Sequence, residues 1–283
     1  MALSVRGGNS IAYPLISIVT PSYNQGQFIE ETIRSVIEQD YPNIEHIVMD
    51  GGSTDETVDV LRRYDGRICW VSEPDEGQAD AINKGLRIAS GEILAYLNSD
   101  DAYLPGAFAV VAKQFVAHPD AGLIFGDCQA VTEAGEVYGL IKGHPFDVRR
   151  MIMRGEFVPQ QAAFWSRQTM DAVGEFDTNL HFCMDHDYFI RIGQRFPGVY
   201  VAQPLANFRF HGSSKTMSLQ DNHWRESMLV SQRYGMTRLT AWYWIRVLRH
   251  RSLRLLPEAV ERYVRYALNR PQDPVVARRQ GQG

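Results

Sequence analysis

Short apolar runs alternate with stretches of helical periodicity over the first hundred residues of the chain. Residues 16–19 form a continuous apolar run rich in β-branched side chains, which predicts a strand buried on both faces. Apolar residues then recur at helical spacing over 28–37, which predicts a helix. The alternation continues with strands expected at 44–49, 68–72 and 93–97 and helices at 54–64 and 79–89. This order predicts an α/β fold with a mainly parallel central sheet flanked by helices.

The regular alternation loosens after Pro105, which is well placed to begin a helix. From about Trp224 onward the pattern is helical, with a break at Pro257 and a disordered end expected after Pro271. The chain therefore divides into a tail over 1–13, a body over 14–220 and a helical extension over 221–283. Between Pro105 and Trp224 we expect strands at 123–125, 162–165 and 199–210, a hairpin near 133–136 and a helix near 187–196.

The composition is that of an ordinary globular protein with an uneven distribution of charge. With 45% hydrophobic residues among 283, the chain can bury a large core in one α/β domain with or without an appendage. Residues 233–283 contain 11 Arg, no Lys and 3 acids, an excess of +8. The rest of the chain must then carry −12 to give the formal total of −4. A basic, aromatic end on an acidic body predicts an anionic partner surface.

Three further features predict a cytoplasmic protein. The first ten residues lack the apolar segment and cleavage pattern of a secretory signal. No stretch reaches the roughly 18 apolar residues that cross a bilayer. The three cysteines are widely separated and odd in number, which argues against a disulfide framework or a cysteine zinc site.

An acidic cluster follows the apolar strand expected at 93–97. Asn98, Asp100 and Asp101 bring carboxylate and amide oxygens together, and two adjacent carboxylates repel each other unless a cation or solvent relieves them. The alternative is a hydrated turn. Magnesium or manganese shared with a diphosphate would neutralise both sides of such a site.

Other polar loops follow the remaining strands, and the ends of parallel strands meet in one crevice. Asp50 precedes two glycines, and in one interpretation its carboxylate accepts hydrogen bonds from a nucleobase or a ribose. In the other interpretation the segment is only a turn in which Ser53 and Glu56 form a capping box, which leaves Asp50 unexplained. Asp75 lies in a turn-forming segment, and Lys84 either approaches a phosphate or forms an exposed salt bridge.

The second half of the body offers weaker candidates. Asp185 is expected just outside a helix, free to take a proton from a substrate hydroxyl, with Asp187 as the helix N-cap. His211 supplies a nitrogen ligand acceptable to manganese, and Arg209 either contacts phosphate or is solvated. The amides of Gln160 and Gln161 either hold an acceptor or phosphate or are ordinary polar loop groups.

The set and order of these segments resemble family 2 glycosyltransferases, which have the GT-A fold, over residues 14–216. Any one segment alone would be weak support. The matching segments are 16–24 (ISIVTPSYN), 50–57 (DGGSTDET), 72–85 (SEPDEGQADAINKG), 97–101 (LNSDD), Asp185 and 208–216 (FRFHGSSKT). The resemblance implies a Rossmann-like nucleotide-binding half over 14–104 and an acceptor-binding half over 105–220.

The resemblance also implies a role for each candidate residue. The implied reaction is inverting: Asp185 deprotonates an acceptor hydroxyl, which attacks the anomeric carbon from the face opposite the nucleotide diphosphate. Asn98 departs from the family, whose acidic motif commonly begins with Asp, so we expect retuned metal binding. The donor site would comprise Pro21, Tyr23, Asp50, Asp75, Lys84, Asn98 and Asp100, the acceptor site Gln160 and Gln161, and the Mn²⁺ or Mg²⁺ site Asp100, Asp101 and His211.

Two rival functions and two interpretations of the basic extension stay open. A nucleotidyltransferase also uses an acidic metal site, although no glycine-rich, basic phosphate loop is present. A non-catalytic nucleotide-sugar binding protein would need no base at Asp185, and the acidic body argues against nucleic acid. The glycosyltransferase would act on a glycan or a lipid-linked acceptor in the synthesis of polysaccharides or glycoconjugates. The helix over 239–256 either packs on the body or lies on the inner face of a membrane.

Overall fold

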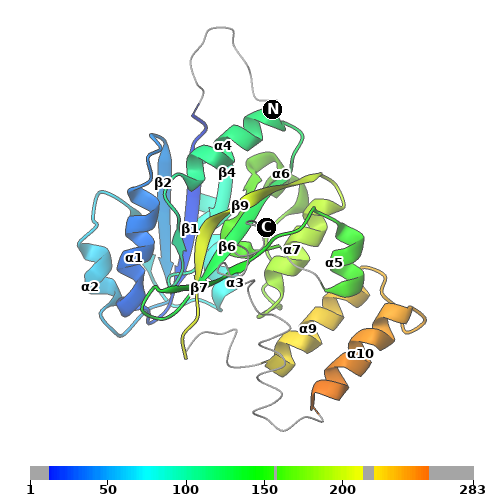
Figure 1. The fold of residues 1–283 in the computed structure, drawn as a ribbon. Helices are drawn as coiled ribbons and strands as arrows, with labels where there is room; N and C mark the ends of the chain where they lie inside the picture. The colour runs from blue at the N-terminus through cyan, green and yellow to red at the C-terminus, as the bar shows by residue number, and fades with distance from the viewer. Residues whose placement is uncertain (1–12, 156–157, 213–219, 255–283) are drawn as a thin grey trace, which may run out of the picture.

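The computed structural model describes residues 13–155, 158–212 and 220–254, and these form one α/β body with a helical extension (Figure 1). Nine strands join in a single sheet in the order β3-β2-β1-β4-β8-β6-β9-β5, with β7 paired to β6. The strands are β1 (Ile16–Ser22), β2 (Ile44–Asp50), β3 (Cys69–Ser72), β4 (Ile93–Tyr96), β5 (Ala102–Tyr103), β6 (Leu123–Val131), β7 (Val137–Ile141), β8 (Ala163–Ser166) and β9 (Gly198–Arg209).

The first four long strands form the parallel half of the sheet. β1 pairs in parallel with β2 and β4, and β2 pairs in parallel with β3. In this register Ser22 lies opposite Asp50, and Asp50 lies opposite Ser72. The carboxyl ends of these strands therefore lie along one edge, as the sequence pattern predicts.

Helices cover both faces of the parallel half. α1 (Gly26–Ile37) and α2 (Thr57–Arg62) bury Ile33 and Leu61 against Val48 of β2. α3 (Gln78–Ile88) packs on the opposite face of β1 and β2, where the alternate β2 residue Met49 points. Successive side chains of a strand point to opposite faces, so they pack into two separate apolar layers, one on each face of the sheet.

The second half of the sheet is mixed. β8 runs antiparallel to both β4 and β6, whereas β6 and β9 are parallel. β6 and β7 form the hairpin expected near 133–136. The helices of this half are α4 (Ala107–Ala117), α5 (Val148–Arg154), α6 (Arg167–Val173) and α7 (Met184–Gly193). The large apolar cluster of the body includes Trp165 and Tyr188, both fully buried.

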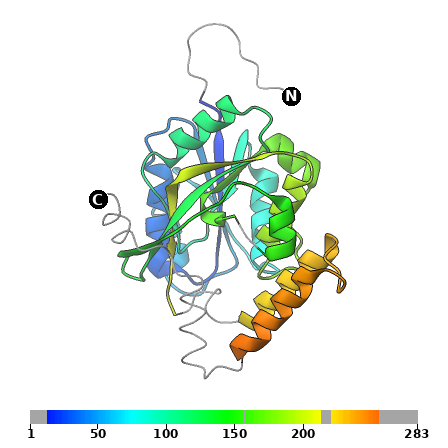
Figure 2. The ribbon, with the colours of Figure 1, turned by 45° about the vertical axis from the view of Figure 1, so that its right-hand side comes forward.

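The described part of the chain ends with two antiparallel helices, which lie beside α5 and α7 (Figures 1 and 2). α9 (Gln220–Arg233) contacts α5 and α7, and α10 (Ala241–Arg254) contacts α5. The helical extension predicted from the sequence is therefore confirmed to residue 254. The break at Pro257, the tail over 1–12 and the end after Pro271 lie outside the described residues. No helix in the described ranges is long and apolar enough to span a membrane.

Candidate active site at the carboxyl edge of the sheet

The loop after β4 brings Asp100 to the end of β9. The Asp100 carboxylate Oδ2 lies 2.9 Å from His211 Nε2. Arg209, the last residue of β9, donates from Nε to the Asp100 carbonyl at 3.0 Å and from its backbone N–H to Asp101 Oδ1 at 2.9 Å. The His211 ring rests against Phe28 of α1, with ring centroids 4.6 Å apart. Residues separated by more than a hundred positions thus form one corner of the site.

The Asp101 carboxylate is occupied by hydrogen bonds within the protein. Its side chain is almost wholly buried, and besides the Arg209 N–H it faces the Asn98 amide at 3.3 Å. Burial, and after it the charge of Asp100, raises the pKa of Asp101 well above its usual range. Asp101, which was expected to be a metal ligand, therefore holds the loop after β4 in place through these bonds. The described residues contain no group of three or more His, Cys, Asp and Glu side chains that could hold a metal.

A second corner forms where the loops after β1, β2 and β3 meet. A Cβ atom built on Gly51 would lie 2.6 Å from an oxygen of the Asp75 carboxylate and 3.4 Å from the Tyr23 ring. A larger residue at this position would therefore displace the Asp75 carboxylate from the corner. Asp75 also accepts a 2.7 Å hydrogen bond from the Gly77 N–H, which fixes its carboxylate over Gly51. Tyr23 is largely exposed at this corner, whereas Pro21 is buried within β1.

Asp50 is more enclosed than the sequence suggests. Its carboxylate accepts hydrogen bonds from the Ser53 N–H at 2.9 Å, from the Ser53 hydroxyl and from the Ser72 hydroxyl at 2.6 Å. The capping box expected from Ser53 and Glu56 does not form, because Ser53 bonds to Asp50 and α2 begins three residues later than expected. Asp50 thus ties β2 to β3 at the edge where Asp75 lies.

Lys84 and Asn98 hold neighbouring loops in place. Lys84 lies 3.1 Å from Asp80 and 3.5 Å from Glu73, so it forms the salt bridge that was one of its two interpretations. The Asn98 amide oxygen accepts from Gln78 at 2.7 Å, which connects the loop after β4 to the first residue of α3.

Asp185 lies in the first turn of α7, not before it. The helix begins at Met184, and its N-cap is Cys183, so the expectation of Asp187 as the N-cap is wrong. Asp187 is instead buried within the helix and pairs with Arg191 at 2.9 Å. An acceptor outside the local sequence binds the backbone N–H groups just before this helix.

That acceptor is Glu226 of α9. Its two carboxylate oxygens accept hydrogen bonds from the backbone N–H groups of His181, Phe182 and Cys183 at 2.7–3.1 Å. A carboxylate placed here also interacts favourably with the positive end of the α7 dipole. α9 therefore holds the entry to the helix that carries Asp185.

Asp185 lies within electrostatic reach of the end of β4. Burial chiefly, and then the charges of Asp185 and Asp101, raise the pKa of Tyr96, the last residue of β4. The Asp185 carboxylate is therefore close enough to the Tyr96 hydroxyl for its charge to act on that group.

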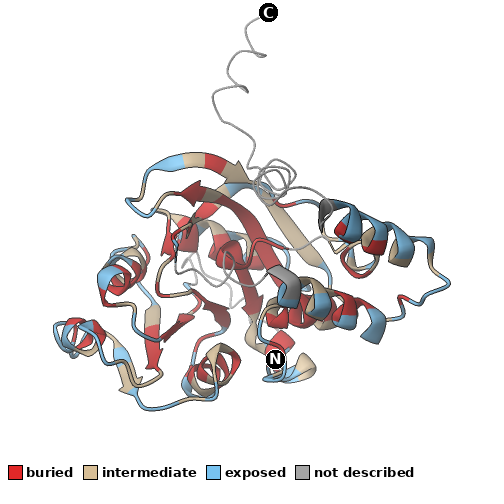
Figure 3. Cartoon of the chain, turned by 90° about the horizontal axis from the view of Figure 1, so that it is seen from below, coloured by how far each residue is buried: buried red, intermediate tan, exposed pale blue. Residues whose placement is uncertain are grey.

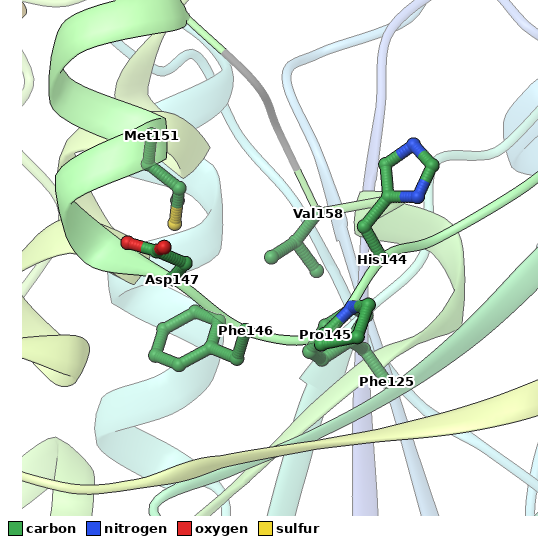
Figure 4. Close-up of a pocket in the computed structure, with 7 residues that line it drawn as sticks. All are labelled: Phe125, His144, Pro145, Phe146, Asp147, Met151 and Val158. Carbon is green, nitrogen blue, oxygen red and sulfur yellow. The ribbon is translucent and has the colours of Figure 1, made fainter.

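Gln160 and Gln161 bond to the end of β4 and to the loop that follows it. Both are buried in a short 3₁₀ turn. Gln160 Nε2 donates to the Tyr96 carbonyl at 2.8 Å, and Gln161 bonds to the Asp101 side chain. A small apolar hollow lies nearby, between β6 and α5 (Figure 4). Its lining comprises Phe125, His144, Pro145, Phe146, Asp147, Met151 and Val158.

Sequence reasoning misjudged one residue that shapes the site, Arg209, and missed another, Glu226. Arg209 is neither solvated nor free for phosphate, because its guanidinium is buried against Glu31 at 2.6 Å and against the hairpin carbonyls. Its position at the end of a strand, two residues before His211, was the available signal. Glu226 gave no local signal, since the N–H groups that it caps lie over forty residues away.

Comparison with known proteins identifies the family. The model of the family described as "Glycosyl transferase family 2" matches residues 17–171. An uncharacterized glycosyltransferase of Mycobacterium tuberculosis is 32% identical over 182 residues, which cover 63% of this chain and 68% of that protein. TuaG of Bacillus subtilis, whose name places it in teichuronic acid biosynthesis, is 46% identical over 94 residues, 32% of this chain and 37% of TuaG. The match thus spans well under half of TuaG.

Solved structures support the fold. TarS of S. aureus (residues 1–349) in complex with UDP-GlcNAc aligns with a TM-score of 0.61 at 18% identity, over 76% of this chain and 65% of that chain. The alignment therefore covers slightly less than two thirds of the TarS chain. The mannosyltransferase PcManGT of Pyrobaculum calidifontis, in complex with GDP-Man and Mn²⁺, aligns with a TM-score of 0.62 at 21% identity, over 91% of this chain and 81% of that chain. The expected GT-A fold is confirmed, and the chain belongs to glycosyl transferase family 2.

Proposed function

We propose that this glycosyltransferase moves a sugar from a nucleoside-diphosphate sugar to a hydroxyl of a glycan or lipid-linked acceptor, with inversion at the anomeric carbon. One observation carries the proposal: Asp100 and His211 meet, 2.9 Å apart, where the loop after β4 reaches the end of β9. This corner would face the donor phosphates, and the Asp185 carboxylate, whose charge acts on Tyr96 at the end of β4, would take the acceptor proton. The relatives named with UDP-GlcNAc and GDP-Man support the class of donor.

The nucleoside end of the donor would occupy the corner formed by Tyr23, Gly51 and Asp75. The exposed Tyr23 ring offers a stacking surface, and the Asp75 carboxylate an acceptor for base or ribose hydrogen atoms. Asp50 would support this corner through Ser53 and Ser72, and Lys84 would hold the β3–α3 loop. Pro21 and Asn98 belong to the framework of the same edge.

Asp100 and His211 fit a divalent cation as a pair of protein ligands. A carboxylate oxygen and an imidazole nitrogen within 2.9 Å suit Mn²⁺ better than Mg²⁺, because nitrogen is a softer donor than oxygen. The relative in complex with Mn²⁺ supports this choice. When bound, the cation would offset the charge of the departing diphosphate. Asp101 would act through the loop, without contacting the cation.

Asp185 would act as the general base. Its carboxylate accepts the proton of the acceptor hydroxyl as the hydroxyl oxygen bonds to the anomeric carbon. The bond from that carbon to the phosphate oxygen breaks on the opposite face, and the electron pair leaves with the nucleoside diphosphate. Gln160 and Gln161 would position Tyr96 and Asp101 beneath this centre and leave acceptor contacts to other residues.

We further propose a division of labour along the chain. Residues 14–104 would bind the nucleotide, residues 105–220 the acceptor, and residues 221–283 would support the base. The name of TuaG supports a role in polysaccharide or glycoconjugate synthesis, and such synthesis from nucleotide sugars would place the protein in the cytoplasm at the inner face of the membrane.

A product assay tests the proposed function. Uridine, guanosine and thymidine diphosphate sugars are incubated with Mn²⁺, acceptor glycans and either the natural chain or Asp100→Asn. We expect release of nucleoside diphosphate by the natural chain and a loss of at least a hundredfold in the variant. Release of pyrophosphate would indicate a nucleotidyltransferase. Donor binding without turnover over the whole acceptor panel would indicate a binding protein, and either result would overturn the proposal.

A further inference from the structure

Helix α10 has one face that packs on the protein. Arg246 donates to the hydroxyls of Ser231 at 2.6 Å and Ser227 at 2.7 Å, both on α9. His250 stacks on Trp224 of α9, with ring centroids 4.1 Å apart. These contacts fix the rotation of α10 about its axis, so its opposite face has a defined direction.

The opposite face is apolar along its centre. Trp244, Ile245 and Leu248 keep 50%, 48% and 62% of their surface exposed. The spacing of three and four residues places them in one stripe along the helix. Figure 3 shows the exposed outer side of this helix at the upper right. Large apolar side chains gathered in this way are unusual on a surface that meets only water.

Arginines border the stripe on both sides. At 100° per residue, Arg249 lies next to Ile245 on one border, and Arg251 lies next to Trp244 on the other. Arg238 precedes the helix and is also exposed. In the part of the chain that the structure describes, no carboxylate lies within 4.0 Å of these three guanidinium groups, and residues 238–251 contain no acid.

We propose that this outer α10 face, formed by Trp244, Ile245, Leu248, Arg249 and Arg251, binds the surface of an anionic lipid bilayer. The apolar stripe enters the boundary between headgroups and acyl chains, and the arginines reach the lipid phosphates. A half-exposed tryptophan suits that boundary, because its ring is apolar and its N–H is already bonded to the Arg238 carbonyl at 2.7 Å.

Charge argues against a second copy of the chain as the occupant. Two copies joined through this face would bring Arg249 and Arg251 of each close to those of the other with no acid between them. An anionic lipid surface attracts the same groups. The face therefore complements a bilayer better than it complements itself.

The position of α10 relates this surface to the site. In Figures 1 and 2 the helix pair extends from the lower side of the body, the side on which β9 ends. α9, which carries α10, also holds the entry to α7 through Glu226. If the proposed function holds, a chain resting on α10 would present its acceptor site near the bilayer, where a lipid-linked acceptor lies.

Vesicle sedimentation with the full chain tests the proposal without any donor or acceptor. Vesicles of phosphatidylcholine alone are compared with vesicles containing 30% phosphatidylglycerol. We expect binding to the anionic vesicles, weakened by added salt, and at least tenfold weaker binding to the neutral ones. Equal binding to both, or no binding to either, would overturn the proposal. Failure here leaves the product assay for sugar transfer unaffected, so the two proposals fail separately.

Two variants and two matched controls assign the binding to this face. Leu248→Ser with Ile245→Ser removes the stripe, and Arg249→Gln with Arg251→Gln removes the bordering charge. We expect each pair to weaken binding about tenfold or more. Val116→Ser on α4 and Arg62→Gln on α2, exposed residues of the same types, are expected to bind as the natural chain does.

The oligomeric state in solution distinguishes lipid binding by this face from self-association through it. All variants are compared with the natural chain by thermal unfolding, because the changed residues are exposed and should leave the midpoint unchanged. Light scattering then measures the mass in solution. A dimer that the Leu248→Ser and Ile245→Ser pair dissociates, together with vesicle binding that the pair leaves intact, would assign the face to self-association and refute the lipid surface.

Discussion

At the scale of single residues, neighbouring acids on α7 have opposite surroundings. Asp185 lies in the first turn of α7 and acts on Tyr96 through its charge, whereas Asp187 is buried and pairs with Arg191 and Arg233 at 2.9 and 2.8 Å. The sequence Met-Asp-His-Asp gives no means of telling them apart, because both acids fit a helix start. The partners that distinguish them come from α7 itself and from α9.

Asparagine substitutions should separate these two roles. Asp185→Asn is expected to lower turnover at least a thousandfold, because it removes the base, while nucleoside diphosphate binding and the unfolding midpoint stay unchanged. Asp187→Asn breaks a buried ion pair and should lower the free energy of unfolding by about 3–5 kcal/mol. Turnover, calorimetric binding and urea unfolding measure these effects. A large loss of donor affinity in Asp185→Asn would assign that residue a structural role.

Buried histidines give the fold a defined acid sensitivity. Burial lowers the pKa of His46 from 6.5 to about 3, and its Nε2 lies 2.9 Å from the Thr20 hydroxyl between β1 and β2. The folded state therefore binds fewer protons than the unfolded state below pH 6.5, so stability is lost as the pH falls toward 3. His46 alone should contribute a slope of up to about 1.4 kcal/mol per pH unit.

Urea unfolding at pH 5.5–7.5 checks this expectation against His46→Gln, which does not titrate. We expect the natural chain to lose more stability than the variant as the pH falls, with the difference growing below pH 6.5. Parallel curves for the two chains would contradict the assignment.

At the scale of elements, a carboxylate of α9 is one of the groups that join the C-terminal helices to the catalytic body. Glu226 of α9 accepts three backbone N–H groups at the entry to α7. Glu226→Gln replaces one accepting oxygen by a donor and removes the charge, so these N–H groups lose partners. We expect a loss of about 1–3 kcal/mol in the opening free energy of residues 181–187 and a reduction of turnover.

Hydrogen exchange of residues 181–187 measures the opening, and a nucleoside diphosphate titration should give the same affinity as in the natural chain. Glu38→Gln, which removes an exposed acid paired with Arg34, is the matched control and should leave both properties unchanged. Unchanged exchange in Glu226→Gln would show that the entry to α7 does not depend on Glu226.

The strength of the periodic pattern decided which elements the sequence could predict. The strands ending at Ser22, Asp50, Ser72 and Tyr96 and the helices between them follow continuous apolar runs and helical spacing, and all are present. The two-residue strand β5 has no periodicity to detect, and the order of β8, β6 and β9 depends on pairings between distant segments. Glycines and acids at strand ends predicted which edge of the sheet carries the site. They did not predict which carboxylates are buried in the protein, as Asp101 is.

At the scale of the whole molecule, the charge asymmetry of the sequence has a structural basis in α10. The sequence left packing and membrane contact as alternatives, yet α10 packs through one face and leaves an apolar face bordered by arginines exposed. The two interpretations are therefore compatible. Whether the outer face binds lipid stays a prediction for the vesicle assay.

The central claim is that loops from opposite halves of the sheet converge on one cation and a donor's diphosphate. A crystal structure of the protein with Mn²⁺ and a nucleoside diphosphate tests it most directly. The account predicts the ion in direct contact with Asp100, His211 and the phosphate oxygens, with the nucleoside between Tyr23 and Asp75. A diphosphate bound elsewhere, with Asp100 and His211 contacting neither ion nor phosphate, would contradict the account.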